Sequence, residues 1–394
     1  MRILFCNYEY PPLGGGGGVV MAALARELAR RRHTVTVLTS RALDLPAESI
    51  EQGVRVLRVP VFFRRQLAVA NFPSMLAYLP MALARGGRLR GEFDVINTHF
   101  VVPTGPVGER LARAHRIPNV LSVHGGDLYD PSKPSSPHRH PWLRAPIRRM
   151  LRRASALVGQ SRNTLEHVER IYGVKRASEL IPLGIDPPPA VPAAARAELG
   201  IPEAALVLVS VGRVVARKAA PQLIEAMARA ERPVMHLVLI GEGPELAAVR
   251  AAAEARGLAA RVHLLGQVSE ERKYALLALA DVFASTSQHE GFGLVFLEAM
   301  ALGLPVVCYD HGGQTDFLRS GKTGFVLPLN DVSAFARGLQ ALHDDPALRA
   351  AMGEHNRRAV EDYLIGRCAE RYEQVFESVI RAFAARAEAP ACVE

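Results

Sequence analysis

The chain has 394 residues, of which 49% are hydrophobic and 22% charged, so it is too long for one ordinary domain and apolar enough to build hydrophobic cores. Its net charge of +9 suits three kinds of partner: nucleic acid, an anionic membrane or an anionic small substrate. No RNA- or DNA-binding signature accompanies the charge, which argues against nucleic acid.

The N-terminal segment MRILFCNYEYPP is the first predicted strand, because its apolar stretch is too short for a signal peptide. No apolar run reaches the roughly 18 residues of a membrane-spanning helix, and a cytoplasmic protein is expected. Cys6, Cys308, Cys368 and Cys392 lack C-x-x-C spacing, which argues against a zinc site and against a disulfide framework.

Short apolar strands alternate with amphipathic helices along the chain, a pattern typical of parallel sheets covered on both faces. The first helix is expected at Val19–Arg31, and later helices near Lys218, Pro244, Ser269, Leu294 and Val332. The expected strands are Ile3–Asn7, Thr34–Thr39, Val54–Pro60, Val95–Thr98, Val120–Val123, Leu157–Gly159, Leu206–Val211, His236–Ile240, Val262–Leu265, Val282–Ala284, Pro305–Cys308 and Phe325–Leu327.

A turn-rich connection separates two halves of this pattern. Six prolines between Pro182 and Pro202 place a domain boundary near residue 188. The expected fold class is therefore α/β, with two Rossmann-like doubly wound domains facing each other across a cleft. Ligands of such sheets bind beyond the carboxyl ends of the strands, so polar and glycine residues at those ends are the candidates.

Five consecutive glycines follow the first strand, and Gly14, Gly15, Gly16 and Gly17 are taken as candidate binding residues. Their uniform spacing does not match a dinucleotide fingerprint, and no strand-end acid follows about 20 residues later. We expect a mobile loop that closes over a phosphate or a sugar. The alternative is an ordinary flexible loop.

The segment NVLSVHGGDLYD ends a predicted strand at His124, and Asp127 follows two glycines. A histidine and an aspartate at a strand end are a reasonable donor and acceptor toward a bound sugar. The alternative for His124 is a purely structural histidine. His99 in INTHF is a weaker candidate of the same kind, and His138 to His140 are expected to be solvated.

Two cations follow the strand Leu206–Val211 in the second half. Arg213 comes directly after Gly212, and Lys218 lies five residues further on. Together they could clamp a diphosphate, with the arginine as a fork and the lysine as a point charge, and stabilise its charge as it leaves. The alternative is two solvated surface bases.

Two acids flank the start of a helix in QHEGFGLVFLEAM. Glu290 precedes Gly291, Phe292, Gly293 and Leu294, and Glu298 lies about one turn into the helix. A buried carboxylate without a partner is costly, so we expect polar partners for both acids. Free amides at the helix start suit phosphate, whereas carboxylates suit sugar hydroxyls, and a nucleotide-sugar supplies both. The alternative is a helix flanked by ordinary acids.

Taken together, these residues resemble the retaining glycosyltransferases of family 4, also called group 1, which have the GT-B fold. The most specific element is E-x7-E, seen as Glu290 and Glu298. The segments SVHGGD, GRVVARK, IGEGP, LGLPVV and GGQTDFLRSGKTG support it in the expected order. The resemblance covers nearly the whole chain.

The resemblance implies a role for each candidate. Glu298 would bind the donor ribose, Glu290 the donor sugar, and His124 the transferred sugar. Arg213 and Lys218 would hold the diphosphate. The remaining binding residues are expected to be Gly14 to Gly17 and Asp127, the loop Gly266–Val268 facing the base, and the backbone of Gly291 to Leu294.

The resemblance also implies transfer with retention and without a divalent metal, so neither a metal site nor a cofactor beyond the co-substrate is expected. The chain has no Asp-x-Asp pair to chelate one. Residues 1–188 would bind the acceptor and 189–365 the nucleotide-sugar, while residues 366–394 would form a helix that returns to the first domain. Ala219 departs from the family, which usually has glycine after the lysine.

The acceptor is a hydroxyl compound that the sequence does not identify, such as a glycan, a glycolipid or a small metabolite; UDP- and GDP-sugars are both open as donors. Residues 61–90 and 142–154 mix apolar residues with arginines, which is compatible with peripheral membrane association or with packed helices that have a solvated basic face. A sugar-nucleotide epimerase, a phosphorylase and a catalytically silent nucleotide-sugar-binding protein are the competing interpretations.

Overall fold

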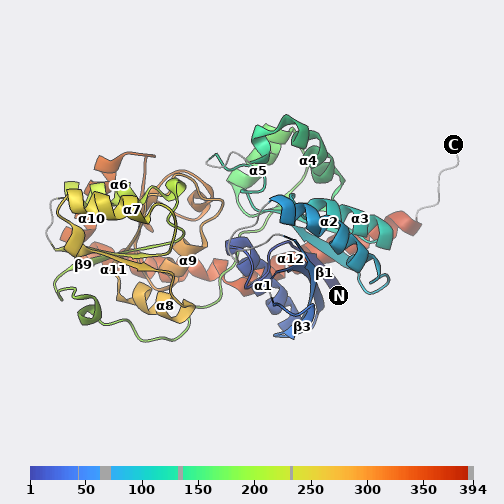
Figure 1. The fold of residues 1–394 in the computed structure, drawn as a ribbon, viewed down its shortest axis with the longest axis horizontal. Coiled ribbons are helices and arrows are strands. Elements are labelled where there is room, and N and C mark those ends of the chain that lie inside the picture. The colour runs from blue at the N-terminus through green and yellow to red at the C-terminus, as the bar shows by residue number, and fades with distance from the viewer. Residues whose placement is uncertain (43, 63–71, 132–135, 231–233, 389–394) are drawn as a thin grey trace. The chain divides into compact units, whose positions relative to one another are not determined.

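The computed structural model describes residues 1–42, 44–62, 72–131, 136–230 and 234–388 (Figure 1). The chain divides into two compact units. Unit 1 consists of Met1–Asp186 together with Ile365–Glu394, and unit 2 consists of Pro187–Leu364. Part of the arginine-rich stretch 61–90 and Cys392 lie outside the described residues.

Unit 1 contains an eight-stranded sheet in the order β3-β4-β2-β1-β5-β6-β7-β8. β3 pairs antiparallel with β4, and the other neighbours are parallel. The strands are β1 (Arg2–Cys6), β2 (Thr34–Arg41), β3 (Glu48–Glu51), β4 (Val54–Pro60), β5 (Val95–His99), β6 (Asn119–Val123), β7 (Ala156–Gly159) and β8 (Glu179–Leu180).

Helices cover both faces of this sheet, as the alternation of side chains along β1 requires. Ile3 and Phe5 belong to a core shared with α1 and α12, whereas Leu4 and Cys6 belong to one shared with α2 and α3. The helices are α1 (Gly16–Arg30), α2 (Phe72–Gly87), α3 (Gly105–His115), η1 (Pro137–Arg139), α4 (Pro141–Arg153), α5 (Arg162–Tyr172) and α12 (Ile365–Glu388). The C-terminal helix is thus an integral part of unit 1.

The expectation of a loop through Gly18 is wrong, because α1 already begins at Gly16. Close packing explains why glycines form this first turn. A Cβ atom on Gly17 would lie 2.3 Å from Cζ of Phe100, and one on Gly18 would lie 3.2 Å from the carbonyl carbon of Glu9. The segment is therefore a closely packed helix start.

Unit 2 contains a six-stranded parallel sheet in the order β11-β10-β9-β12-β13-β14. The strands are β9 (Leu206–Val211), β10 (Met235–Ile240), β11 (Val262–Gly266), β12 (Val282–Ser285), β13 (Val306–Tyr309) and β14 (Gly324–Leu327). The helices are η2 (Arg196–Leu199), η3 (Ala216–Lys218), α6 (Ala220–Arg229), α7 (Leu246–Ala255), η4 (Ala259–Arg261), α8 (Glu270–Leu279), α9 (Leu294–Ala301), η5 (Gly313–Asp316), α10 (Val332–Asp344), α11 (Pro346–Ala359) and η6 (Val360–Tyr363).

Each sheet has the strand reversal of a doubly wound fold. In unit 1, β2 to β4 lie on one side of β1 and β5 to β8 lie on the other, so the strand order reverses between β1 and β5. In unit 2, β10 and β11 lie on one side of β9 and β12 to β14 on the other, so the order reverses between β9 and β12. At such a reversal the connections diverge to opposite faces, which leaves a crevice at the carboxyl ends of the two strands. The α/β class and the doubly wound topology predicted from the sequence are confirmed. In the parts of the chain that the structure describes, no helix has the length and apolar character needed to cross a membrane.

Candidate functional site

Most of the predicted site residues lie at the strand reversals of the two units, whereas Gly266 and Val268 lie at the end of the edge strand β11. In unit 2, Arg213 and Lys218 follow β9, and Glu290 follows β12. Because these two strands are neighbours, the ends of both connections meet at one edge of the sheet. This placement brings together acids and cations that are about 70 residues apart in the sequence.

Glu290 is buried, with 8% of its surface exposed, and it has two cationic partners. Its Oε1 pairs with Nζ of Lys218, and its Oε2 lies 3.4 Å from Nη1 of Arg217. Burial on its own would raise the pKa of Glu290, but the charges of Lys218 and Arg217 outweigh burial and lower the pKa to about 2. The carboxylate is therefore ionised at neutral pH.

Arg217, which the sequence analysis did not select, fastens η3 to the loop after β12. Its guanidinium donates to the carbonyl oxygen of His289 and lies 3.4 Å from Oγ of Ser287. Its own carbonyl accepts from the amide of Gln288 at 2.8 Å. The sequence signal was its position inside GRVVARK, between the two cations that were selected.

Arg213 and Ala219 lie at the two ends of this connection. The Arg213 side chain is exposed and forms no hydrogen bond or ion pair with the described residues. Ala219 has a φ of +44°, in the left-handed region that favours glycine. The backbone therefore adopts a glycine-like turn at the position where the family usually has glycine.

The second acid of the motif, Glu298 in α9, also has a partner that the sequence did not reveal. Its Oε2 lies 2.9 Å from Nζ of Lys273 in α8, and the same ammonium lies 2.7 Å from Oε2 of Glu270. Burial raises the pKa of Glu298 in spite of the opposing charge of Lys273. Both buried acids are thus paired with lysines, as the cost of an isolated buried charge requires.

The start of α9 follows a glycine turn and has no side-chain cap. Gly293 has a φ of +95°, and a Cβ atom there would lie 2.4 Å from Cδ2 of Phe296, so a larger residue would be strained. No side chain caps the helix, whose first residue is Leu294. The ring of Phe292 is buried and packs against Phe317.

The loop predicted to face the base begins where β11 ends. The carbonyl oxygen of Gly266 accepts a hydrogen bond from the amide of Gly241 at 2.8 Å, which joins the ends of β10 and β11. Val268 follows two residues later and is half-buried. Gly266 is the last residue of β11, and Val268 lies in the connection after it, so both are at the carboxyl edge of the sheet, with β10 between β11 and β9.

In unit 1, His124 lies at the end of β6 and is buried beside two residues from the end of β5. Its Nε2 is 2.9 Å from Nδ1 of His99, and its ring centroid is 4.3 Å from that of Phe100. Burial lowers the pKa of His124 to about 4, so the ring is neutral at pH 7. Because Phe100 also contacts Gly17, the structure brings the glycine segment close to His124.

Asp127 and Gly14 hold the backbone of this region in place. The two carboxylate oxygens of Asp127 accept from the amides of Val101 and His124, at 2.6 and 3.0 Å. Gly14 has a φ of +102°, and the next amide, that of Gly15, donates to Oε2 of Glu9 at 3.1 Å. Asp127 thus positions His124 and the end of β5, while Gly14 to Gly16 lead into α1.

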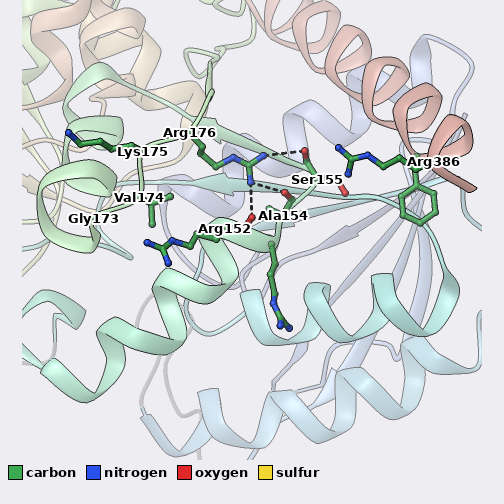
Figure 2. Close-up of a pocket in the computed structure, with 10 residues that line it drawn as sticks. Arg152, Ala154, Ser155, Gly173, Val174, Lys175, Arg176 and Arg386 are labelled. Atoms are coloured by element: carbon green, nitrogen blue, oxygen red, sulfur yellow. Dashed lines mark hydrogen bonds between the residues drawn. The ribbon is translucent and has the colours of Figure 1, made fainter. Parts of the chain in front are cut away.

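A separate pocket of about 720 Å³ lies in unit 1 beside the start of β7 (Figure 2). None of the predicted site residues lines it. Arg176 crosses its wall and donates to the carbonyl oxygen of Ala154 at 2.8 Å and to that of Ser155 at 3.3 Å. The charged residues that line the pocket are all basic: Arg152, Arg153, Lys175, Arg176 and Arg386.

Comparison with known proteins gives matches over both units. The family model described as Glycosyltransferase Family 4 matches residues 14–188, and the model described as Glycosyl transferases group 1 matches residues 193–359. The chain is 30% identical over 373 residues to the GDP-mannose-dependent alpha-(1-6)-phosphatidylinositol monomannoside mannosyltransferase of Mycolicibacterium smegmatis. That alignment covers 89% of this chain and 91% of the relative.

Two further similarities agree with these matches. The N-acetyl-alpha-D-glucosaminyl L-malate synthase of Bacillus anthracis is 26% identical over 399 residues, covering 94% of this chain and 96% of the relative. The structure of sucrose-phosphate synthase from Thermosynechococcus elongatus superposes with a TM-score of 0.82 at 24% identity, covering 97% of this chain and all of that one. The second similarity bears on the fold alone.

Proposed function

The chain belongs to the group 1 glycosyl transferases, and from this premise we propose that it moves a hexosyl group from a UDP- or GDP-sugar to a hydroxyl acceptor, with retention and without a divalent metal. The observation that carries the proposal is the grouping of Lys218, Arg217 and Glu290 at the strand reversal of unit 2. A diphosphate needs cations, and a sugar needs hydrogen-bond acceptors. This edge of the sheet offers both.

In the proposed site, Lys218 and Arg213 bind the donor diphosphate. Arg213 is exposed and forms no ion pair with the described residues, so its fork of donors is available to phosphate oxygens. Lys218 is held in place by Glu290 before the donor arrives. As the bond to the sugar breaks, charge grows on the leaving phosphate, and both cations stabilise it.

The same cations provide the reason for proposing metal independence. Arg213, Arg217 and Lys218 supply positive charge at the end of β9, where a metal-dependent enzyme would use a chelated ion. The leaving phosphate can itself accept the acceptor's proton, so the proposed mechanism assigns no side chain as general base. The backbone amides at the start of α9 complete the phosphate contacts.

In unit 2, we place the donor sugar against Glu290 and the donor ribose against Glu298, with the base beside Gly266 and Val268. Glu290 is ionised and accepts hydroxyl protons. Glu298 is held by Lys273, which fixes its orientation before a ribose binds. In unit 1, His124 is proposed to hydrogen-bond the transferred sugar. Gly14 to Gly17 and Asp127 shape the surroundings of His124 through the backbone of α1 and the ends of β5 and β6.

The acceptor is proposed to bind to unit 1. The names of the two relatives specify a phosphatidylinositol monomannoside and an L-malate product, so a glycolipid and a small metabolite are both compatible with this family. We propose a cytoplasmic enzyme that associates with the surface of anionic membranes through unit 1. Trp142 at the start of α4 is 63% exposed, and basic residues line the pocket at the other end of this helix (Figure 2).

The test of the function is product analysis after incubation with a panel of radiolabelled UDP- and GDP-sugars. A transferase yields free nucleoside diphosphate together with a glycosylated acceptor or, without an acceptor, slow donor hydrolysis. An epimerase would return an intact nucleotide with an altered sugar, and a phosphorylase would require inorganic phosphate. Binding of a donor without turnover under every acceptor condition would favour a silent binding protein and contradict the proposal.

A further inference from the structure

A continuous chain of hydrogen bonds runs from His124 at the proposed sugar site to the C-terminal helix of unit 1. Nε2 of His124 lies 2.9 Å from Nδ1 of His99, and Nε2 of His99 lies 2.8 Å from Oδ1 of Asn97. Nδ2 of Asn97 donates to Oγ of Ser122 at 3.0 Å, and this oxygen is 2.9 Å from the hydroxyl of Tyr372. All five side chains are buried.

The amide of Asn97 has only one sensible orientation. Its Nδ2 also lies 3.0 Å from the carbonyl oxygen of Val120, which can only accept a hydrogen bond. The group that faces Val120 must therefore be the NH2, and the carbonyl oxygen of the side chain must face His99. It follows that Nε2 of His99 carries a proton and donates it to Asn97.

This orientation fixes both imidazoles. Burial keeps His99 neutral, so its Nδ1 has a lone pair and can only accept. Nε2 of His124 must therefore be the donor in the bond between the two rings. His124 is neutral as well, which leaves its own Nδ1 without a proton.

Nδ1 of His124 is the unpartnered end of this chain. It is buried and has no hydrogen-bond partner within 3.5 Å among the described residues, and His124 as a whole is 7% exposed. The side-chain amide of Gln160 lies beside this histidine, opposes the effect of burial on its pKa, and donates from Nε2 to the backbone carbonyl oxygen of His124 at 2.5 Å. An acceptor without a partner at such a position costs free energy, which a ligand donor would recover. At this strand end, the ligand donor expected from the proposed function is a sugar hydroxyl.

We propose that Asn97 and His99 are positioning residues that hold His124 as the Nε2–H tautomer, so that its Nδ1 accepts a hydrogen bond from one hydroxyl of the transferred sugar. This inference rests on the proposed function for the identity of the ligand, whereas the tautomer is a property of the free protein. It also defines a specificity rule. The sugar must present an O–H donor to His124. A fluorine on the carbon that carries this hydroxyl cannot replace the hydroxyl, because it has no proton to donate.

The tautomer is tested by 15N NMR of the full chain labelled on histidine, without ligand, at pH 7. The signals of His124 are assigned by their loss in His124→Asn. We expect an unprotonated Nδ1 and a protonated Nε2 in the wild type and in His99→Gln, whose amide oxygen can still accept. In His99→Leu the acceptor is gone, and a mixture of tautomers is expected. His236→Leu, which removes a buried histidine from unit 2, should leave His124 unchanged.

A protonated Nδ1 in the folded wild type, or an unaltered tautomer in folded His99→Leu, would overturn the positioning role. The specificity rule is tested separately with UDP-glucose and GDP-mannose, each with one sugar hydroxyl at a time replaced by fluorine. For the donor that binds, one replacement should weaken binding by about tenfold in the wild type and have no effect in His124→Ala. Equal losses in both proteins would overturn the hydroxyl contact. If neither parent nucleotide-sugar binds, the donor proposed above fails, while the NMR result still decides the tautomer.

Discussion

Lys273 in α8 and Glu298 in α9 form an ion pair in which Nζ and Oε2 lie 2.9 Å apart, with side chains that are 11% and 15% exposed. Lys273 also lies 4.8 Å from the ring centroid of Tyr274. In the sequence, α8 precedes β12 and α9 follows it, so the ion pair links the two helices that flank this strand along the chain. β12 is the strand that leads to Glu290. Glu298 depends on Lys273 for compensation of its charge, whereas Lys273 also pairs with Glu270 at 2.7 Å.

Lys273→Met is expected to destabilise unit 2 by about 3 kcal/mol, because it leaves Glu298 buried without its cation. Urea unfolding of the full chain measures this. The double variant Lys273→Met with Glu298→Leu should recover most of the loss, since no unpaired charge remains. A single variant as stable as the wild type would mean that the two charges are not coupled.

Lys218→Ala is expected to lower kcat by about 10²- to 10³-fold, because the leaving diphosphate loses a cation, and to change the KM for the acceptor little. Steady-state kinetics with the donor found in the panel measure both parameters. Lys322→Ala removes an exposed lysine of unit 2 and serves as the control. An unchanged turnover in Lys218→Ala would place the diphosphate elsewhere.

Ala219→Gly is expected to stabilise the chain by about 1 kcal/mol, because the φ of +44° is unfavourable for a residue with a Cβ atom. Thermal and urea unfolding measure the change. Ala228→Gly, inside α6, makes the same chemical change at a helical position and should destabilise by roughly 0.5–1 kcal/mol. Destabilisation by both substitutions would contradict a strained Ala219.

Acid is expected to weaken unit 2 through Glu290. The pKa of this carboxyl is about 2 in the folded protein and 4.5 as the ordinary value, so its pairing stabilises the fold above pH 4.5 and is lost as the pH falls toward 2. The full effect is about 3 kcal/mol. Urea unfolding at pH values from 7 to 3 should show a steeper loss for the wild type than for Glu290→Gln. Parallel curves would refute the depressed pKa.

The full chain is expected to float with liposomes that contain anionic lipid at low salt, and not with zwitterionic liposomes, because the basic surface of unit 1 binds anionic lipid. Arg152→Glu with Lys175→Glu reverses two charges at the basic pocket and should abolish flotation. As a control, Arg250→Glu with Arg337→Glu makes the same charge change at exposed positions of unit 2, and this variant should still float. Absence of binding by the wild type at low salt would end the membrane proposal.

The sequence predicted the strands well where the strand is a run of mostly apolar, buried residues. Val54–Pro60 and Leu206–Val211 have the predicted bounds. β3 was missed because Glu48–Glu51 is a polar edge strand without such a run, and β8 because it has only two residues. Local patterns carry no signal for strands of this kind.

The candidate site was predictable as a set of residue types but not as a set of pairs. The two acids of E-x7-E were expected to need partners, yet nothing local indicates that Lys218 pairs with Glu290 or Lys273 with Glu298. Those contacts depend on which connections converge at the end of β12. The helical start of α1 was missed for a similar reason. Phe100, which packs against Gly17, is more than 80 residues away in the sequence.

The place of α12 in unit 1 has a consequence for the order in which the protein can fold during synthesis. Tyr372 and Phe376 belong to the same core as Phe5 and Leu24, although they are translated more than 340 residues later. The sheet of unit 1 therefore lacks part of its core until α12 has been translated, whereas unit 2 is contiguous and can finish first. Nascent chains paused before Ile365 should hold unit 1 in a protease-sensitive form.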